Sequence, residues 1–522
     1  MNKVINLRIP HIGEQILQNL ETDQLLQCLE VSTTWKFMAE NVILKKWKNR
    51  IIDACWEGNI GIVKVLLELS NIGGIDWNVK DEEGNTPFMI ACSKGDKAKD
   101  FIKLILDHSE SKGIDLNAKD NDGQTAFIIV CGEFGDLDTV KLLLDSNKNI
   151  DVNAKNNQGF TALMSACSEG HIDVVNLLLS QSQSKNIDLN ARGPLGDTAL
   201  MQAVLSDHFE IIKLILQYSG RTNIDVNAAY PDDGLTAFIY AYSEQNLETM
   251  RLFLDFAENI DLNVYYDYEN ESCTVLSQAC HKEEIDVVKL LLRHPKGKTM
   301  DLNCKTANGF TPLMSASLNG NTELATLLLE HSEGTNIDLN AKDSEGNTAF
   351  GIACSNDNIE IVKLLLNYST NKSLDVNSKS NDGCTALMNA CMYGNIDIVK
   401  LLLTHSSSRD IDLNARDNDG HTIFMNVCTR GDLNIAKLFL NHPNSNCIDF
   451  NAKDGDDYTA FELAWEQEEF EIIKLLCDYS AEKNIQIPDP STSDIFDDTL
   501  KRKIARKRRR LEKRKPNKRR KL

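Results

Sequence analysis

The chain has 522 residues, of which 42% are hydrophobic and 25% are charged, and its formal net charge at pH 7 is −21. Its fourteen cysteines include no Cys-x-x-Cys pair, which argues against a zinc motif or a disulfide framework. No apolar run approaches the roughly 20 residues that span a bilayer, and the first residues lack the apolar stretch of a signal peptide, so we expect an intracellular protein with no membrane partner.

A short segment, residues 1–8, precedes a region at 9–49 that does not share the repeat of the rest of the chain. The apolar spacing of this region predicts three short helices. The stretch LETDQLLQCLEVSTTW, which ends at Trp35, resembles the F-box, although Asp23 stands one place early and Ile9 replaces the usual Leu before the proline.

The F-box resemblance implies contact with a Skp-type adaptor that is joined to a cullin ligase. The residues at the matching positions, which we expect to be partly exposed without that partner, are Pro10, Ile16, Leu17, Leu20, Leu25, Val31 and Trp35. An alternative interpretation of these helices requires no adaptor. Because the end of a stacked-repeat domain must be covered, the same helices would then only cap the first repeat.

A unit of about 37 residues recurs from residue 49 to residue 487, about twelve times. An [Ile/Met/Leu]-Asp-x-Asn marker precedes a Thr-[Ala/Pro]-[Leu/Phe]-like triplet in most units. The threonines of the triplets are Thr86, Thr125, Thr161, Thr198, Thr236, Thr274, Thr311, Thr348, Thr385, Thr422 and Thr459. One unit cannot bury its apolar surface alone, so the repeat predicts a stack.

The unit at 151–187 shows why each repeat should form a turn and two helices. Gly159 suits a tight turn, and Thr161 suits a helix cap. Small apolar residues such as Cys167 predict an inner helix that ends at Gly170, and the bulkier VVNLLL predicts an outer helix that covers it. The stretch TALMSACSEGHIDVVNLLL resembles the ankyrin repeat, with its Thr-Pro-Leu-His-x-Ala signature.

The two resemblances together imply an all-α fold, an ankyrin-repeat solenoid of helix-turn-helix units with hairpin loops, preceded by a small F-box-like domain. Eight residues separate the triple Leu from the next marker, where the usual ankyrin unit has about four, so we expect an extra helical turn or a longer loop there. In some units the Gly that links the two helices is replaced, which costs conformational energy if the residue is left-handed. These replacements are Asp207, Gln245, Glu283, Asp357 and Glu468.

Eight cysteines share one phase of the inner helix, which predicts a small buried core position. They are Cys55, Cys92, Cys131, Cys167, Cys280, Cys354, Cys391 and Cys428. Histidines follow the outer-helix leucines in five units, and stacked units lie roughly 8–10 Å apart, which is too far for neighbouring equivalents to share a zinc ion. They are His108, His294, His331, His405 and His442. With no nucleophile and base motif either, we expect no cofactor and no enzyme activity.

Two central hairpins differ from the Asp, Asn and Gly tips found elsewhere, because they contain tyrosines. Aromatic residues at a polar tip indicate a contact surface. The target-binding candidates are Tyr230, Tyr265, Tyr266 and Tyr268. The alternative is sequence drift, with the rings lying on neighbouring loops.

A linker at 488–500 leads to the basic segment 501–522, which holds fifteen Lys or Arg and one Glu, a net charge of +14. We expect this tail to be disordered when free. Nuclear import through importin, a nucleic-acid contact and self-association with the acidic repeats are all compatible with it. The nuclear-localisation candidates are Lys501, Arg502, Lys503, Arg506, Lys507, Arg508, Arg509, Arg510, Lys513, Arg514 and Lys515.

Two functions fit these features. The first is a substrate-recognition subunit of an SCF-type ubiquitin ligase, in which the F-box holds the Skp-type adaptor and the repeats hold a target protein. The second is an ankyrin scaffold in the nucleus, associated with nucleic acid through its tail. The basic tail makes us expect the nucleus, or nucleus and cytoplasm. An F-box joined to a long ankyrin array resembles proteins of large DNA viruses and intracellular bacteria that act on host cells, which implies that the cell is a host cell.

Overall fold

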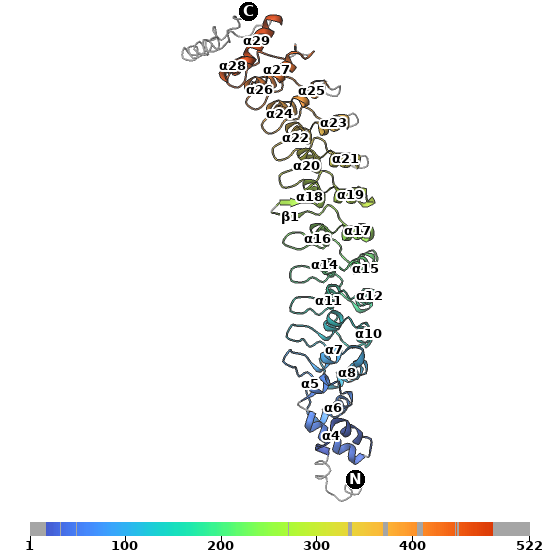
Figure 1. Cartoon of the computed structure of the whole chain (residues 1–522). Helices are drawn as coiled ribbons and strands as arrows, with labels where there is room; N and C mark the ends of the chain where they lie inside the picture. The colour runs from blue at the N-terminus through green and yellow to red at the C-terminus, as the bar shows by residue number, and fades with distance from the viewer. Residues whose placement is uncertain are drawn as a thin grey trace, which may run out of the picture. The chain divides into compact units, whose positions relative to one another are not determined.

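The computed structural model describes residues 17–31, 33–47, 50–269, 271–331, 337–368, 374–404, 411–443, 445 and 448–483. These residues form two compact units, one up to Asp261 and one from Leu262 onward. Within each unit, pairs of helices stack side by side and hairpin loops project from one edge (Figure 1). The expected all-α stack of helix-turn-helix units with hairpin loops is confirmed, with one two-stranded hairpin added in the second unit.

Within the described residues of the first unit, two complete helices precede the repeats, and inner and outer helices then alternate. The two leading helices are α3 (Thr22–Cys28) and α4 (Thr33–Trp47). The inner elements are α5 (Ile51–Trp56), α7 (Pro87–Ser93), α9 (Ala126–Ile129) with the π-helix η2 (Val130–Phe134), α11 (Ala162–Glu169), α14 (Ala199–Leu205) and α16 (Ala237–Ser243). The outer helices are α6 (Ile60–Gly73), α8 (Lys99–Lys112) after the 3₁₀ turn η1 (Gly95–Ala98), α10 (Leu137–Asp145), α12 (Ile172–Ser180), α15 (Phe209–Ser219) and α17 (Leu247–Phe256).

The second unit opens with the hairpin of β1 (Tyr266–Tyr268) and β2 (Glu271–Cys273) and continues with the same alternation. The inner helices are α18 (Val275–His281), α20 (Pro312–Asn319), α22 (Ala349–Ser355), α24 (Ala386–Tyr393), α26 (Ile423–Arg430) and α28 (Ala460–Glu466). The outer helices are α19 (Ile285–Arg293), followed by the 3₁₀ turn η3 (Pro295–Thr299), α21 (Thr322–His331), α23 (Ile359–Tyr368), α25 (Ile396–Thr404), α27 (Leu433–Leu440) and α29 (Phe470–Lys483).

In both units each inner helix packs on the next inner helix, and each outer helix packs on the next outer helix. The repeated threonine starts every inner helix after α5: the hydroxyl of Thr161, for example, accepts a hydrogen bond from the Met164 N–H at 3.4 Å. Gly170 then ends that helix with φ at 84°. The marker and cap residues seen in the sequence are therefore the start and stop signals of the structure.

In each repeat, the turn between the inner helix and the outer helix contains one residue in the left-handed backbone conformation. Where Gly is replaced, Asp207, Gln245, Glu283, Asp357 and Glu468 take the same conformation, with φ between 54° and 64°. This confirms the conformation expected from the sequence. Stacking on neighbouring repeats holds these residues in a backbone region that side chains disfavour.

The expected extra turn is present after α12, where the short helix α13 (Ser182–Lys185) ends at Asn186 with φ at 53°. The eight cysteines of the inner-helix phase are buried and reduced, as expected. Burial raises the pKa of the Cys55 thiol to about 12 and raises the pKa values of the other seven as well. These thiols pack as small apolar groups.

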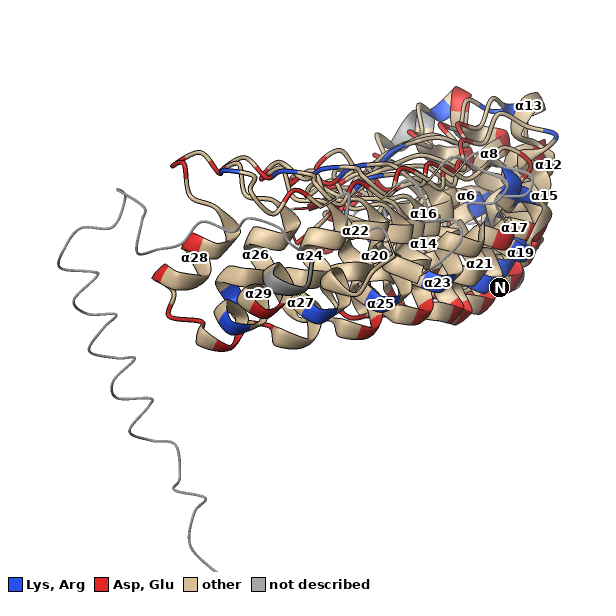
Figure 2. Ribbon diagram, turned by 90° about the horizontal axis from the view of Figure 1, so that it is seen from above, with Lys and Arg blue, Asp and Glu red and all other residues tan. Residues whose placement is uncertain are grey.

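Charged side chains lie mainly on the hairpins and the outer helices (Figure 2). The inner helices α20, α22 and α24 contain none. Among the described residues, no helix combines the length and the apolar character that crossing a bilayer requires.

Candidate functional site

The Asp-x-Asn marker joins each repeat to the next through its asparagine. Asn153 donates from Nδ2 to the Asn186 carbonyl at 2.8 Å, and its Oδ1 accepts from the Asp188 N–H at 2.8 Å. The aspartate of the marker accepts from the N–H of its own asparagine, as Asp151 does at 3.1 Å, and so orients that residue. The same pair of inter-repeat bonds is made by Asn78, Asn117, Asn190, Asn227 and Asn263.

A second ladder runs along the base of the hairpins and uses a basic residue two positions after the asparagine. Lys119 donates from Nζ to the Lys155 carbonyl at 2.7 Å, and Lys155 donates to the Arg192 carbonyl at 2.8 Å. In the second unit, Lys305, Lys342 and Lys379 make the equivalent bonds. These cations therefore hold neighbouring hairpins together and are not free to serve as a basic surface.

The hairpins that contain tyrosines depart from this ladder. Ala229 occupies the basic position in one hairpin, where its carbonyl accepts from Arg192 Nη1 at 2.7 Å. Tyr265 occupies the basic position in the other. Its hydroxyl accepts from the Lys305 N–H at 3.3 Å, so the ring replaces a lysine as the link to the following hairpin. Partial burial raises the pKa of Tyr265, and its side chain is still 47% exposed.

Tyr230 and Tyr266 occupy the next position, which in other repeats caps the turn. Asp120 shows the usual arrangement: its Oδ1 accepts from the N–H groups of Asp122 and Gln124 at 2.9 and 2.7 Å. A tyrosine cannot make this cap. Both tyrosines therefore lie at the base of their hairpins and not at the tips where the sequence pattern placed them.

Tyr266 belongs to the core. It pairs with Cys273 in the β1–β2 hairpin and is only 3% exposed. Burial raises its pKa above the usual range, with further contributions from Cys273 and the Glu284 carboxylate. The expectation that Tyr266 contacts a target is wrong for this fold, because alternation along the strand directs its ring inward.

Tyr268, two residues further along β1, is half-buried. The ammonium of Lys282 lies 4.3 Å from the centre of its ring. One face of this ring is therefore occupied by a cation of the same chain.

Tyr230 lies in the first unit, and its N–H donates to the Leu235 carbonyl at 3.0 Å. Tyr240, on the inner helix α16, was missed by the sequence reasoning and is also half-buried. Partial burial raises the pKa of Tyr230, and Asp197, Tyr240 and Asp233 add to the shift. The signal that could have identified Tyr240 is its place in the inner helix, four residues after the capping threonine, where the other repeats that start with this threonine have no aromatic residue.

The N-terminal helices bury some of the F-box candidates and leave others exposed. Leu17, Leu25 and Trp35 are buried, with α3 and α4 packed on each other and on α6. The expectation that these three side chains are exposed without a partner is therefore wrong, because they build the core that joins the helices to the first repeat. Leu20 is half-buried, and Val31 is 56% exposed.

Phe37 is a further exposed residue of this region, at 65%, and the sequence reasoning missed it. It follows the buried Trp35 by two positions in α4, which places the two side chains on different faces of the helix. Pro10, Ile16 and the basic segment 501–522 lie outside the described residues.

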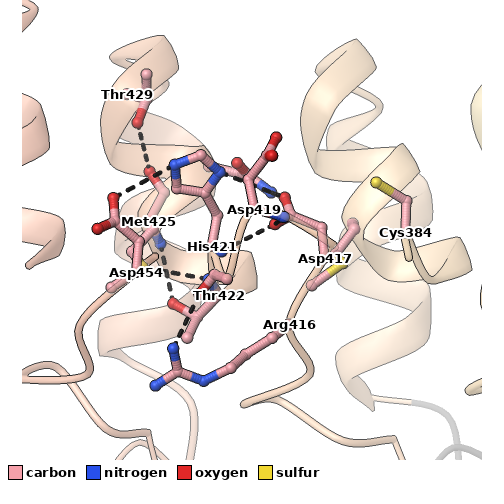
Figure 3. A network of polar contacts seen from close by, with 12 residues as sticks. Cys384, Arg416, Asp417, Asp419, His421, Thr422, Met425, Thr429 and Asp454 are labelled. Carbon is pink, nitrogen blue, oxygen red and sulfur yellow. Dashed lines mark hydrogen bonds and ion pairs between the residues drawn. The ribbon is translucent and has the colours of Figure 1, made fainter. Parts of the chain in front are cut away.

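A network of polar groups in the second unit contains a histidine between two hairpins (Figure 3). His421 Nδ1 lies 3.5 Å from Asp417 Oδ2, and His421 Nε2 lies 3.4 Å from Asp454 Oδ2. Ligand atoms of Asp417, Asp419 and His421 lie within 4.8 Å of one another, and such groups are ligands of first-row transition metals.

The hydrogen bonds that Asp417 makes in this network stabilise the turn of its own hairpin. Asp417 Oδ1 accepts from the N–H groups of Asp419 and His421 at 3.1 and 2.8 Å, as the turn-capping aspartates of other repeats do. Cys384, one repeat earlier, is partly buried, and burial followed by Asp417 and two further carboxylates raises its pKa. This cluster was not expected from the sequence, where the recurring histidines follow the outer helices and His421 lies in a hairpin.

The family model described as "Ankyrin repeats (3 copies)" matches the chain in overlapping segments. The segments are 51–156, 112–192, 185–266, 219–298, 262–343, 333–417 and 407–487. The chain belongs to the ankyrin-repeat family. The match does not include α3 or α4, and no curated protein matches the chain.

Ankyrin repeats bind protein partners, and the exposed parts of this array show where contact is available. Large apolar side chains are exposed at the ends of several inner helices, next to the turn that leads to the outer helix. They are Trp56, Phe134 and Leu205 in the first unit and Leu318 and Tyr393 in the second. Exposed apolar residues of this size are common anchors at interfaces.

Proposed function

We propose that this ankyrin-repeat protein is an adaptor that brings a target protein to an SCF-type ubiquitin ligase. The observation that supports the proposal most directly is a long ankyrin array joined to a helical segment whose sequence resembles the F-box. The array supplies the target-binding part, and α3 and α4 supply the contact with a Skp-type adaptor and, through it, a cullin. Ankyrin-repeat proteins are generally binding scaffolds without catalytic activity.

Val31 and Phe37 are the exposed apolar residues of the N-terminal helices that we assign to adaptor contact. Val31 lies in the turn between α3 and α4, and Phe37 lies early in α4. Burying a large apolar side chain at an interface stabilises the complex by roughly 1.5–3 kcal/mol. Leu17, Leu25 and Trp35 contribute indirectly, because they hold these helices in place.

Co-expression of the full chain with a Skp-type adaptor tests this assignment. We expect a stable complex with the wild type and loss of the complex with V31D together with F37D, since two carboxylates would enter an apolar interface. L318D is the matched control, because it places the same charge on an exposed residue of the second unit. Absence of a complex with the wild type would contradict the ligase role.

A second function is supported by the charge of the tail. The segment 501–522 has a net charge of +14, while the remaining residues have −35, since −21 minus 14 is −35. We propose that this segment binds importin and carries the protein into the nucleus, where the array acts as a scaffold. Deletion of 501–522, or R508A with R509A and R510A, should leave a fluorescent fusion in the cytoplasm.

Continued nuclear entry of the deleted form would assign the tail to another role. Salt-sensitive binding of the intact chain, but not of the deleted chain, to random DNA would then indicate a phosphate contact. Adaptor binding is measured in the same samples, so the two functions are tested independently.

A further inference from the structure

His421 is the only histidine of the chain that immediately precedes one of the capping threonines. Two repeats whose turn is capped by an aspartate have asparagine at this position. Asn347 Nδ2 donates to Asp343 Oδ2 at 3.4 Å, and Asn85 Nδ2 donates to Asp81 Oδ2 at 3.3 Å. The side chain at this position therefore faces the carboxylate that caps its own hairpin, and His421 replaces an uncharged amide with a group that can carry a proton.

The ring of His421 also faces a second carboxylate, which belongs to the following hairpin (Figure 3). Its Nδ1 lies 3.5 Å from Asp417 Oδ2, and its Nε2 lies 3.4 Å from Asp454 Oδ2. The side chains of Asp417 and Asp454 are only 10% and 3% exposed. The two ring nitrogens are thus directed at two buried carboxylates of successive repeats.

Backbone hydrogen bonds hold both carboxylates in place. Asp454 Oδ1 accepts from the N–H groups of Asp456 and Tyr458 at 2.9 and 2.8 Å, as Asp417 Oδ1 does in its own turn. Among the described residues, the only ion-pair contact of Asp454 is the one with His421. Neither carboxylate can turn away from the ring without losing the cap of its hairpin.

Other groups of the same hairpin leave this arrangement to the ring. Asp419 adds a third carboxylate, since its ligand atom lies within 4.8 Å of those of Asp417 and His421. Arg416 is the cation of this hairpin, and its Nη1 donates to the carbonyls of Gly420 and Lys453 and not to a carboxylate.

The elements packed on either side add one thiol, one amide and one further cation. On the preceding hairpin, burial, followed by Asp417 and two further carboxylates, raises the pKa of Cys384, so its thiol is neutral near pH 7. In α26, Asn426 Nδ2 donates to Asp417 Oδ2 at 3.3 Å. On the following hairpin, Lys453 Nζ pairs with Asp457 Oδ1 at 3.5 Å.

The number of protons on the ring decides how many carboxylates it can bind. A neutral imidazole has one N–H, so it donates to one carboxylate and turns a lone pair toward the other. An imidazolium has two N–H groups and a positive charge, so it can donate to both. An asparagine at this position cannot change its charge.

We propose that His421 is a pH-sensitive link between the hairpins that lead into α26 and α28. The protonated ring holds Asp417 and Asp454 together, and loss of the proton loosens the hairpin of the later repeat. Imidazole takes up its proton below about pH 6.5, whereas carboxylates stay ionised down to about pH 4. Because the folded form binds the proton, stability from this link is present in mildly acidic solution and is lost as pH rises toward about 8.

Hydrogen exchange of the full chain, followed by mass spectrometry of a peptide covering 454–459, tests the proposal. This peptide includes Gly455, whose N–H donates to the Asp419 carbonyl of the preceding hairpin at 3.0 Å. The wild type is compared with H421N at the same pH, so the intrinsic pH dependence of exchange cancels. We expect exchange to be roughly three to ten times faster in H421N at about pH 6, and equal in the two proteins at about pH 8.

A peptide covering 343–347 is the control within the same samples. It contains the turn of Asp343 and Asn347 and an equivalent bond from the Ser344 N–H to the preceding hairpin, but no histidine. Its exchange should be the same in both proteins at both pH values. An H421N effect on 454–459 that is equal at the two pH values would overturn the proposal.

D454N removes the second charge and keeps an acceptor for the turn of its own hairpin. In this background, H421N should have the same small effect at both pH values, and a pH-dependent effect that persists would contradict the link. If H421N does not fold, the exchange of 454–459 relative to 343–347 in the wild type is compared at the two pH values. A relative rate that does not rise from about pH 6 to about pH 8 then overturns the proposal.

EDTA separates proton binding from metal binding at the same groups. The proposal requires the pH-dependent difference to be equal with and without EDTA. A difference that disappears in EDTA would assign it to a metal ion held by His421 and its neighbouring carboxylates, and would overturn the assignment to a proton.

Discussion

Replacing Asn153 by Ala tests whether the asparagine ladder holds neighbouring repeats together. The change removes one bond from Nδ2 to the Asn186 carbonyl and one from the Asp188 N–H to Oδ1, each 2.8 Å long. It leaves the helices and the apolar core of both repeats untouched. The variant therefore reports on the contact between repeats and not on the folding of either one.

The expected loss follows from the two bonds and from their exposure. A typical intramolecular hydrogen bond contributes about 0.5–1.5 kcal/mol net to the free energy of unfolding. Removing two such bonds should therefore lower that free energy by at most about 1–3 kcal/mol. Both bonds lie at the surface, where water replaces part of what is lost. We therefore expect N153A to lower the free energy of unfolding of the first unit by about 1–2 kcal/mol.

Urea unfolding followed by circular dichroism at the helical band measures this loss. Q183A is the control, because Gln183 is exposed in α13 and none of the hydrogen bonds of the described chain involves its side chain. N153D keeps the acceptor for Asp188 but turns a carboxylate oxygen toward the Asn186 carbonyl, so it should be at least as destabilising as N153A. A midpoint for N153A equal to that of Q183A would refute the reasoning.

Three further predictions concern the backbone and the buried thiols. Q245G should raise the free energy of unfolding by about 0.5–1 kcal/mol, as judged from the urea midpoint, because relief of a left-handed residue at φ 56° outweighs the greater freedom of the unfolded chain. G135A should lower it by about 2–3 kcal/mol, because φ is 60° and the new Cβ would come within 2.3 Å of His171 Nδ1; a loss below 1 kcal/mol would show that His171 moves freely. The folded chain should lose stability as pH rises from about 8.5 toward 12, because burial raises the pKa of Cys55 to about 12 while the unfolded thiol releases its proton near its ordinary pKa. Urea midpoints at neutral and alkaline pH measure this loss, and iodoacetamide at neutral pH should label the exposed Cys477 but not Cys55.

The candidate site divides into parts that the sequence could reveal and parts that it could not. The contrast between tyrosine-containing and ordinary hairpins is visible in the residues, and Tyr230 and Tyr265 are partly accessible in the structure. The direction of each ring is not visible, because strand pairing with Cys273 buries Tyr266 and Lys282 occupies a face of Tyr268. Tyr240 was overlooked because it lies in an inner helix and not in a hairpin.

The N-terminal helices show the same limit. Matching residues to the F-box pattern selects types of side chain, and here the matching positions include both buried and exposed residues. Packing on α6 makes Leu17, Leu25 and Trp35 structural, while Phe37, outside the pattern, is exposed.

The sequence alone determined the repeat period, the two helices of each unit, their caps, the buried cysteines and the left-handed links, because these depend on residues a few positions apart and recur about a dozen times. Only the tertiary structure decided which polar residues join one repeat to the next and which aromatic residues remain at the surface. Those outcomes depend on contacts between residues more than thirty positions apart, as between Asn153 and Asp188. A local pattern carries no information on such a contact until stacking sets the distance between the repeats.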